Sequence, residues 1–474
     1  MVPGRRGVEP GVSEASAGVP STSTGVPSAP TGVPSAPAPS ARLPVAVLVL
    51  GAAVFALGTS EFMLSGLLPE VADDLDVSIP AAGLLISAFA IGMVVGAPLL
   101  AAATQRLPRR LTLVWLLAVF AVGHVVGALA PAYWVLFLCR VVSALACAGF
   151  WAVGAAVAIS LVPVHARARA MAVMIGGLSI ANIAGVPGGA VLGQSLGWRS
   201  AFWAVALLTV AGLVGVLLLV PRAAEREADE RPPLRSELRI YRDPLVWLAV
   251  ATTALFAAGT FCFFSYLAPL LTDVTGLDEG WVPVVLVLYG VGALIGTVAG
   301  GRLADAHMFG TLYVGLGAAA AVLALAAVTA HNAVAAVTLS GLLGLASFLC
   351  APGLNARIFN VATADAPTLA GATVTSAFNT GNTLGPWVGG LVISAGLGYA
   401  ATAWVGALLV LGALVGAWLQ SRAGRPGQVV AGSAASAGSA GSAGSAAGPV
   451  GQPVSRRSSE RTLNRAVDSQ RPAP

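Results

Sequence analysis

The chain has 474 residues, of which 57% are hydrophobic and only 9% are charged, and its formal net charge is +5. Together with a mean hydropathy of +0.85, this composition excludes an ordinary soluble domain and indicates a polytopic membrane protein embedded in a lipid bilayer. The excess positive charge is explained by the topology of the loops, so it implies no nucleic-acid partner.

Apolar stretches close to the ~20 residues needed to cross the hydrocarbon core follow one another along the chain. The sequence predicts an all-α membrane protein with twelve transmembrane helices. In chain order we place them at 44–69, 81–103, 111–131, 133–162, 171–195, 200–220, 245–271, 281–301, 309–330, 333–357, 369–396 and 400–420.

The first six predicted spans resemble the last six when the sequence is shifted by about 200 residues. Near the start of each half, Phe55, Ala56, Gly58, Thr59 and Phe62 reappear as Phe256, Ala257, Gly259, Thr260 and Phe263. Such a repeat is typical of transporters whose halves rock around a shared central site. It predicts two pseudo-symmetric six-helix halves, 43–221 and 245–421, joined by a cytoplasmic linker at 222–244.

Every basic residue in the chain is Arg, and the loops that carry Arg alternate with loops that carry only acids or no charge. By the positive-inside rule the Arg-bearing side is cytoplasmic, which places both termini inside. Arg199 is the one basic exception on the predicted outer side. The terminal segments, 1–42 and 422–474, are rich in small residues and Pro and are predicted to be disordered tails.

Several chemistries have no sequence signature here. A Walker A loop needs a Lys, and this chain has none. We find no His-Glu-x-x-His metal motif and no Gly-x-Ser-x-Gly nucleophile elbow, so we expect no metal, no cofactor and no enzymatic activity. The four Cys all fall inside predicted spans and imply no disulfide framework.

Two ionisable residues at membrane depth stand out: Glu61 in the first span and Arg140 in the fourth. At ~1.5 Å per residue, both lie ~10–12 Å below the outer surface, so we hypothesise an ion pair or hydrogen bond between them. An intramembrane carboxylate indicates a functional site, here a proton carrier, although a static hydrogen-bonding role is the alternative. Arg140 either tunes Glu61 or only anchors helices.

Small residues, aromatics and amides supply the remaining candidates. Clusters of Gly and Pro in the fifth and eleventh spans allow close packing or a gating bend, and they include Gly185, Pro187, Gly189, Gly385 and Pro386. For a cavity that holds a ring-bearing solute, the candidate lining residues are Phe89, Trp151, Asn182, Phe264, Tyr266, Asn379 and Asn382.

The twelve-span, two-half pattern resembles the major facilitator superfamily. Gly301-Arg302-Leu303-Ala304-Asp305 matches the start of the loop motif that governs the family's cytoplasmic gate. The first-half copy departs from it, because Ala101, Gln105 and Pro108 replace the usual residues, although Arg106, Arg109 and Arg110 are retained. The resemblance also implies that Arg140 is the family's fourth-span Arg, and that the Gly-Pro clusters are its antiporter motif.

A narrower resemblance covers almost all of residues 44–420. The stretch from Gly58 to Pro69, with Ser87–Gly92 and Gly197–Trp203, is similar to chloramphenicol-resistance exporters of the drug:proton antiporter group. This resemblance implies a monomer in a bacterial cell membrane that exports chloramphenicol by alternating access, with Glu61 exchanging protons. Exporters of sugars or nucleosides share part of the pattern and remain an alternative, as do a facilitator or importer without proton coupling and an intramembrane enzyme.

Overall fold

The computed structural model describes residues 43–104, 107–163, 166–221, 238–361 and 367–423. The predicted N-terminal tail, Arg106, most of the linker and the predicted C-terminal tail from residue 424 on therefore lie outside the described residues, whereas residues 422 and 423 end the last helix. The helices belong to one compact unit, Pro44–Pro474. Within the described part, every regular element is helical.

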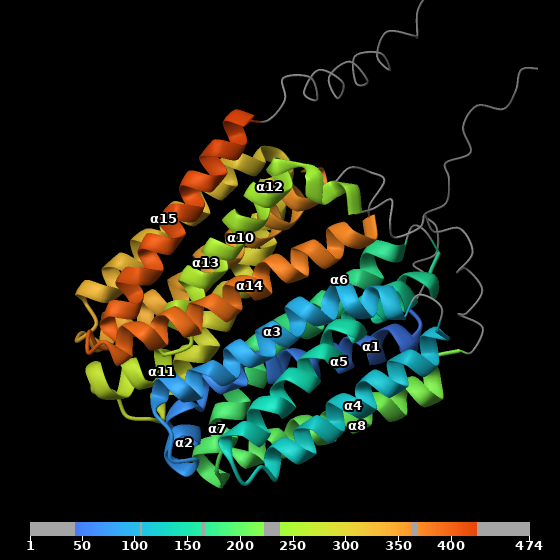
Figure 1. The fold of residues 1–474 in the computed structure, drawn as a ribbon, viewed down its shortest axis with the longest axis horizontal. Helices are drawn as coiled ribbons and strands as arrows, with labels where there is room; N and C mark the ends of the chain where they lie inside the picture. The colour runs from blue at the N-terminus through green and yellow to red at the C-terminus, as the bar shows by residue number, and fades with distance from the viewer. Residues whose placement is uncertain (1–42, 105–106, 164–165, 222–237, 362–366, 424–474) are drawn as a thin grey trace, which may run out of the picture. The chain divides into compact units, whose positions relative to one another are not determined.

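The elements follow each other in the order shown in Figure 1. They are α1 (Val45–Phe62), η1 (Met63–Gly66), α2 (Leu68–Asp74), α3 (Ile79–Ala103), α4 (Arg109–Ala128), α5 (Tyr133–Ser160), α6 (Arg167–Ile180), η3 (Ala181–Gly185), α7 (Val186–Leu196), α8 (Arg199–Leu219), η5 (Leu238–Arg242), α10 (Pro244–Phe264), α11 (Leu267–Pro269), η6 (Leu270–Val274), α12 (Trp281–Val328), α13 (Ala333–Val361), α14 (Pro367–Ser394) and α15 (Ala400–Ala423).

Ten helices in the described part are long and apolar enough to cross a membrane. One of them, α12, is 48 residues long and contains His307 with φ −145° and ψ 73°, outside the helical region. This break separates the two spans predicted at 281–301 and 309–330. The helix α14 covers the span predicted at 369–396, but it is not among the ten. The all-α membrane fold is confirmed, whereas the count of twelve, the halves and the position of the termini stay predictions.

The fifth predicted span changes its winding at the Gly-Pro cluster. Residues Ala181–Gly185 form a π-helical turn, in which the Val186 N–H bonds to the Ala181 carbonyl. Pro187 follows at the start of α7 and has no N–H to continue the regular ladder. Single π turns inside helices are frequent at functional sites, so this turn is compatible with the predicted gating role of the cluster, which stays a prediction.

Close backbone contact joins α12 to α13 through one row of glycines. A Cβ added at Gly292, Gly296 or Gly300 would lie 2.2–2.3 Å from a carbonyl oxygen of α13. Small residues at four-residue spacing let transmembrane helices approach until their backbones touch. The row therefore fixes α12 against α13 along several turns.

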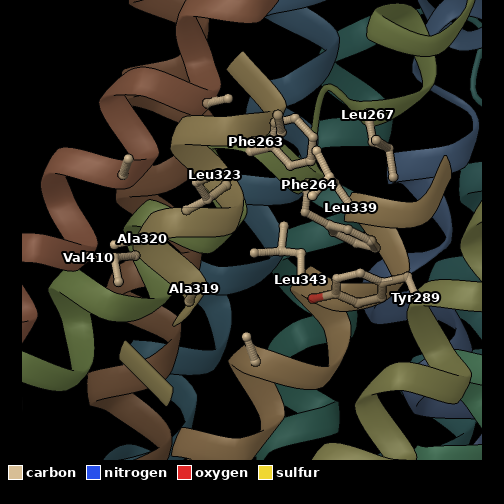
Figure 2. Close-up of a cluster of buried hydrophobic side chains, with 14 of the residues drawn as sticks. Phe263, Phe264, Leu267, Tyr289, Ala319, Ala320, Leu323, Leu339, Leu343 and Val410 are labelled. Atoms are coloured by element: carbon tan, nitrogen blue, oxygen red, sulfur yellow. The ribbon is translucent and has the colours of Figure 1, made fainter. Parts of the chain in front are cut away.

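Two features of the packing position the site. The helix α14 lies beside α3 (Figure 1), so a C-terminal helix packs along an N-terminal one. A buried apolar cluster fills the space between α10, α12, α13 and α15, and Figure 2 shows Phe264, Tyr289 and Leu343 gathered in it. The rings of Phe264 and Tyr289 stack at a centroid distance of 4.4 Å, and both belong to the lining of the cavity described next.

Candidate functional site

A cavity of about 340 Å³ lies among the transmembrane helices. Residues of α1, α3, α5, α6, η3, α10, α12, α13 and α14 line it. Six of the predicted site residues meet there: Glu61, Trp151, Asn182, Phe264, Asn379 and Asn382. A cavity of this size, mostly apolar with a few polar groups, is suited to a small organic molecule.

Two predicted lining residues lie elsewhere. The lining of this cavity, as the described residues form it, does not include Phe89 or Tyr266. Both are fully buried: Phe89 lies under the guanidinium of Arg140 at 4.3 Å, and the Tyr266 hydroxyl donates to the Pro386 carbonyl at 2.7 Å. Each ring fills space between helices, so their prediction as cavity residues is corrected.

The sequence analysis missed most of the aromatic wall. The additional lining residues are Phe62, Met93, Leu178, Phe256, Ala257, Thr260, Phe261, Tyr289, Ser347, Phe348, Ala351, Asn355, Val374, Thr375 and Phe378. Part of this set has a sequence signal, because Phe256 and Thr260 precede the predicted Phe264 by eight and four residues and so share its helical face. Tyr289 and Phe348 come from α12 and α13, in which no candidate for the cavity lining had been identified.

Glu61 is in the last turn of α1, where its half-buried side chain lines the cavity. Among the described residues, no group donates a hydrogen bond to its carboxylate, and the one ion pair joins Arg199 to Asp74. The carboxylate is thus the acidic group in the cavity lining, and no donor among the described residues binds it.

Arg140 is almost completely buried and binds backbone rather than the Glu61 carboxylate. Its Nη1 donates to the Ser60 carbonyl and hydroxyl, both at 2.9 Å. Longer bonds of 3.4 Å reach the carbonyls of Glu61 and Leu85. The hypothesis of contact between Glu61 and Arg140 therefore holds only at the backbone, and the ion pair between the side chains is not formed.

The way in which α1 ends explains why Arg140 binds carbonyl oxygens and not the Glu61 carboxylate. The α-helix of α1 ends at Phe62 and passes into the 3-10 turn Met63–Gly66. The last carbonyls of an α-helix lack regular partners and carry the negative end of the helix dipole. The guanidinium of Arg140 donates hydrogen bonds to these carbonyls. The similar membrane depth of Glu61 and Arg140 did not reveal that the carbonyls compete with the Glu61 carboxylate for the guanidinium.

A buried His that the sequence analysis set aside completes this network. Nδ1 of His124 lies 2.8 Å from the Phe120 carbonyl, and its Nε2 lies 2.6 Å from the Ser60 hydroxyl. A carbonyl only accepts, so Nδ1 carries the proton and Nε2 accepts from Ser60. The chain of bonds runs from Arg140 through Ser60 to His124 and links α5, α1 and α4. Its signal in the sequence was an ionisable residue inside a predicted span.

The predicted gating residues are spread over several environments. Arg110 donates through Nη2 to the Leu217 carbonyl of α8, while Asp305 is exposed near the break in α12. Arg109 is the first residue of α4. In the Gly-Pro clusters, a Cβ at Gly185, Gly385 or Gly389 would lie within 3.0 Å of a neighbouring helix, so these glycines permit close packing.

The sequence profile of the Major Facilitator Superfamily matches residues 50–385. The chain belongs to that superfamily. A chloramphenicol resistance protein of Streptomyces lividans is 43% identical over 355 residues, which are 75% of this chain and 90% of the relative. The inner membrane transport protein YdhP of Escherichia coli K12 is 40% identical over 361 residues, 76% of this chain and 92% of the relative.

A solved structure supports the fold. The bacterial homologue of the human lysosomal transporter Spinster, solved in an inward-facing and unoccupied conformation, superposes with a TM-score of 0.63 over 81% of this chain and 98% of that one, at 19% identity. Membership in a family of transporters makes this chain a multi-pass membrane transporter, which takes a small molecule across the bilayer. The expected resemblance to chloramphenicol-resistance proteins is confirmed.

Proposed function

We propose that this major facilitator exports chloramphenicol, or a solute of similar size and chemistry, in exchange for protons, and that it works as a monomer in a bacterial cell membrane. The observation that carries the proposal is the Glu61 carboxylate, which faces an aromatic cavity without a hydrogen-bond donor among the described residues. The name of the Streptomyces lividans relative supports the choice of solute.

Glu61 serves as the proton carrier in this scheme. An acid on the wall of a cavity that opens alternately to each side takes up a proton from outside as the solute leaves, and releases it inside. One proton entering down ~100 mV supplies ~2.3 kcal/mol, enough for an outward gradient of about fifty-fold for a neutral solute. Arg140 holds the end of α1 in place while Glu61 changes its protonation.

Accumulation of labelled chloramphenicol in a susceptible bacterium tests this function. Cells that express the protein are expected to accumulate little drug until a protonophore is added, whereas cells that express Glu61→Gln accumulate it from the start. Asp73→Asn is the matched control, since Asp73 is an exposed acid outside the cavity. Accumulation that is the same in all strains would reject chloramphenicol and favour a sugar, a nucleoside or another drug as the solute. Low accumulation that persists in Glu61→Gln and with protonophore would contradict proton coupling through Glu61.

A further inference from the structure

The polar groups of the cavity are divided unequally between its walls. Nine buried side-chain polar atoms of the described residues lack a hydrogen-bond partner. Four of them belong to residues that line the cavity, and all four come from α13 and α14: Ser347 Oγ, Asn355 Oδ1, Asn379 Oδ1 and Asn382 Oδ1. We call the three amide oxygens, those of Asn355, Asn379 and Asn382, the acceptor wall.

Such a concentration is unusual. Most buried polar side-chain atoms are hydrogen-bonded, and each buried group left without a partner costs ~1–3 kcal/mol. Three amide oxygens and a hydroxyl without partners around one cavity therefore favour a partner that enters it.

The hydrogen bonds within α14 identify which atom of Asn379 is free. Its Nδ2 donates to the Thr375 carbonyl at 3.0 Å, and a backbone carbonyl accepts only from a donor, so the amide nitrogen is committed. The free atom is the oxygen, which is an acceptor. Asn382 follows three residues later and shares this face of the helix.

The two threonines of the lining are satisfied by their own helices. The Thr260 hydroxyl donates to the Phe256 carbonyl at 3.1 Å, and the Thr375 hydroxyl donates to the Gly371 carbonyl at 3.2 Å. The unsatisfied hydrogen-bonding capacity therefore lies in the three amide oxygens and the Ser347 hydroxyl.

We infer that the acceptor wall recognises hydroxyl or amide N–H donors of the solute, while the aromatic residues of the cavity hold its ring. Carbonyl oxygens on one wall and the Glu61 carboxylate on the other disfavour an anionic solute. The three side chains line the cavity, but their oxygens are buried. A donor group of the solute therefore reaches these oxygens only when the acceptor wall closes around the solute. The inference rests on the proposed function, since chloramphenicol combines an aromatic ring with hydroxyl and amide N–H groups.

Binding to the purified full-length protein tests the acceptor wall. The probes are chloramphenicol and its deoxy analogues, in which one hydroxyl is replaced by hydrogen, and fluorescence of Trp151 on the cavity wall reports binding. The wild type is expected to bind chloramphenicol about five- to thirty-fold more tightly than at least one analogue, the range that corresponds to one or two hydrogen bonds. Asn382→Leu is expected to lose this preference, whereas Thr297→Val and Thr329→Val, outside the cavity lining and with hydroxyls bonded within their own helix, keep it.

Thermal unfolding separates loss of binding from loss of folding. Asn382→Leu removes a buried polar group that has no partner, so its melting midpoint is expected to equal or exceed that of the wild type. A stable Asn382→Leu protein that retains the wild-type preference overturns the acceptor wall but leaves the proposed function standing. An equal loss of preference in the threonine controls has the same two consequences. A wild type that does not bind chloramphenicol contradicts the proposed function and this inference together.

Discussion

The guanidinium of Arg140 binds the last turn of α1, where it donates hydrogen bonds to both the carbonyl and the hydroxyl of Ser60, each at 2.9 Å. The charge of Arg140 thus stabilises backbone carbonyls of α1, and the Glu61 carboxylate beside them stays directed to the cavity. Arg140 anchors the end of the helix, and the Glu61 carboxylate takes no part in this anchoring.

We expect Arg140→Lys to destabilise the protein although the charge is kept. An ammonium has three donors at one point and lacks the fork that reaches Ser60, Glu61 and Leu85 together, so buried carbonyls lose partners at a cost of ~1–3 kcal/mol. The free energy of unfolding in detergent measures the effect, with the exposed Arg302→Lys as control. An Arg140→Lys protein as stable as the wild type would show that only the charge matters.

The bond between Ser60 and His124 predicts coupled mutational effects. Ser60→Ala and His124→Phe each break the 2.6 Å contact, and each is expected to lower the free energy of unfolding. The double variant should be less destabilised than the sum of the single ones, with a coupling of ~0.5–3 kcal/mol, as for residues in one network. A double-mutant cycle gives this value, and strict additivity would mean that the two side chains do not interact.

Close contact between Gly83 and Tyr266 predicts a steric block between α3 and the C-terminal helices. A Cβ at Gly83 would lie 2.3 Å from the Tyr266 hydroxyl, which is held by the Pro386 carbonyl. We expect Gly83→Ala to reduce transport and Tyr266→Phe to restore part of it. Gly317→Ala is the control, because nothing lies within 4 Å of its added Cβ. Equal transport by both glycine variants would show that this contact has no role.

At the predicted outer surface, Asp74 accepts a hydrogen bond from Arg199, and this bond, opposed by partial desolvation, lowers the pKa of Asp74. Because the pKa of Asp74 is lower in the folded state, the ion pair adds stability at pH values above the ordinary Asp pKa of ~3.9. This stability is lost as the pH falls through the lower pKa of the folded state. Both side chains are more than one third exposed, so the contribution is below ~1 kcal/mol. Melting curves should show a smaller loss of stability below about pH 4 for Asp74→Asn than for the wild type. Identical pH profiles would contradict the prediction.

The helical membrane fold could be predicted from the sequence because the bilayer imposes the same requirements on every span. Each span must be apolar over its length, and the Arg residues gather in the loops on one side. The sequence also identified Glu61, Asn182, Asn379 and Asn382, all of which line the cavity, since polar groups inside spans are costly and rare. The long helix α12 was predicted as two spans, and the break at His307 explains how both descriptions apply.

The remaining features of the site depend on where each side chain points. Neither the composition of a span nor the depth of a residue in the membrane determines that direction. Equal depth placed Glu61 near Arg140 but did not show that the guanidinium binds Ser60 and the backbone at the end of α1. An aromatic residue in a span fills a core, as Tyr266 does, or lines a cavity, as Tyr289 does. That choice is made by the packing of neighbouring helices.

Proton movement driven by the drug is the most direct test of the central claim. The protein is reconstituted into vesicles that contain a pH-sensitive dye and have an imposed pH gradient, and chloramphenicol is added on one side. We expect wild-type and Asp73→Asn vesicles to move protons when the drug is added, and Glu61→Gln vesicles to move none. Proton movement by Glu61→Gln at the wild-type rate, or drug flux in the wild type without proton movement, would contradict the account.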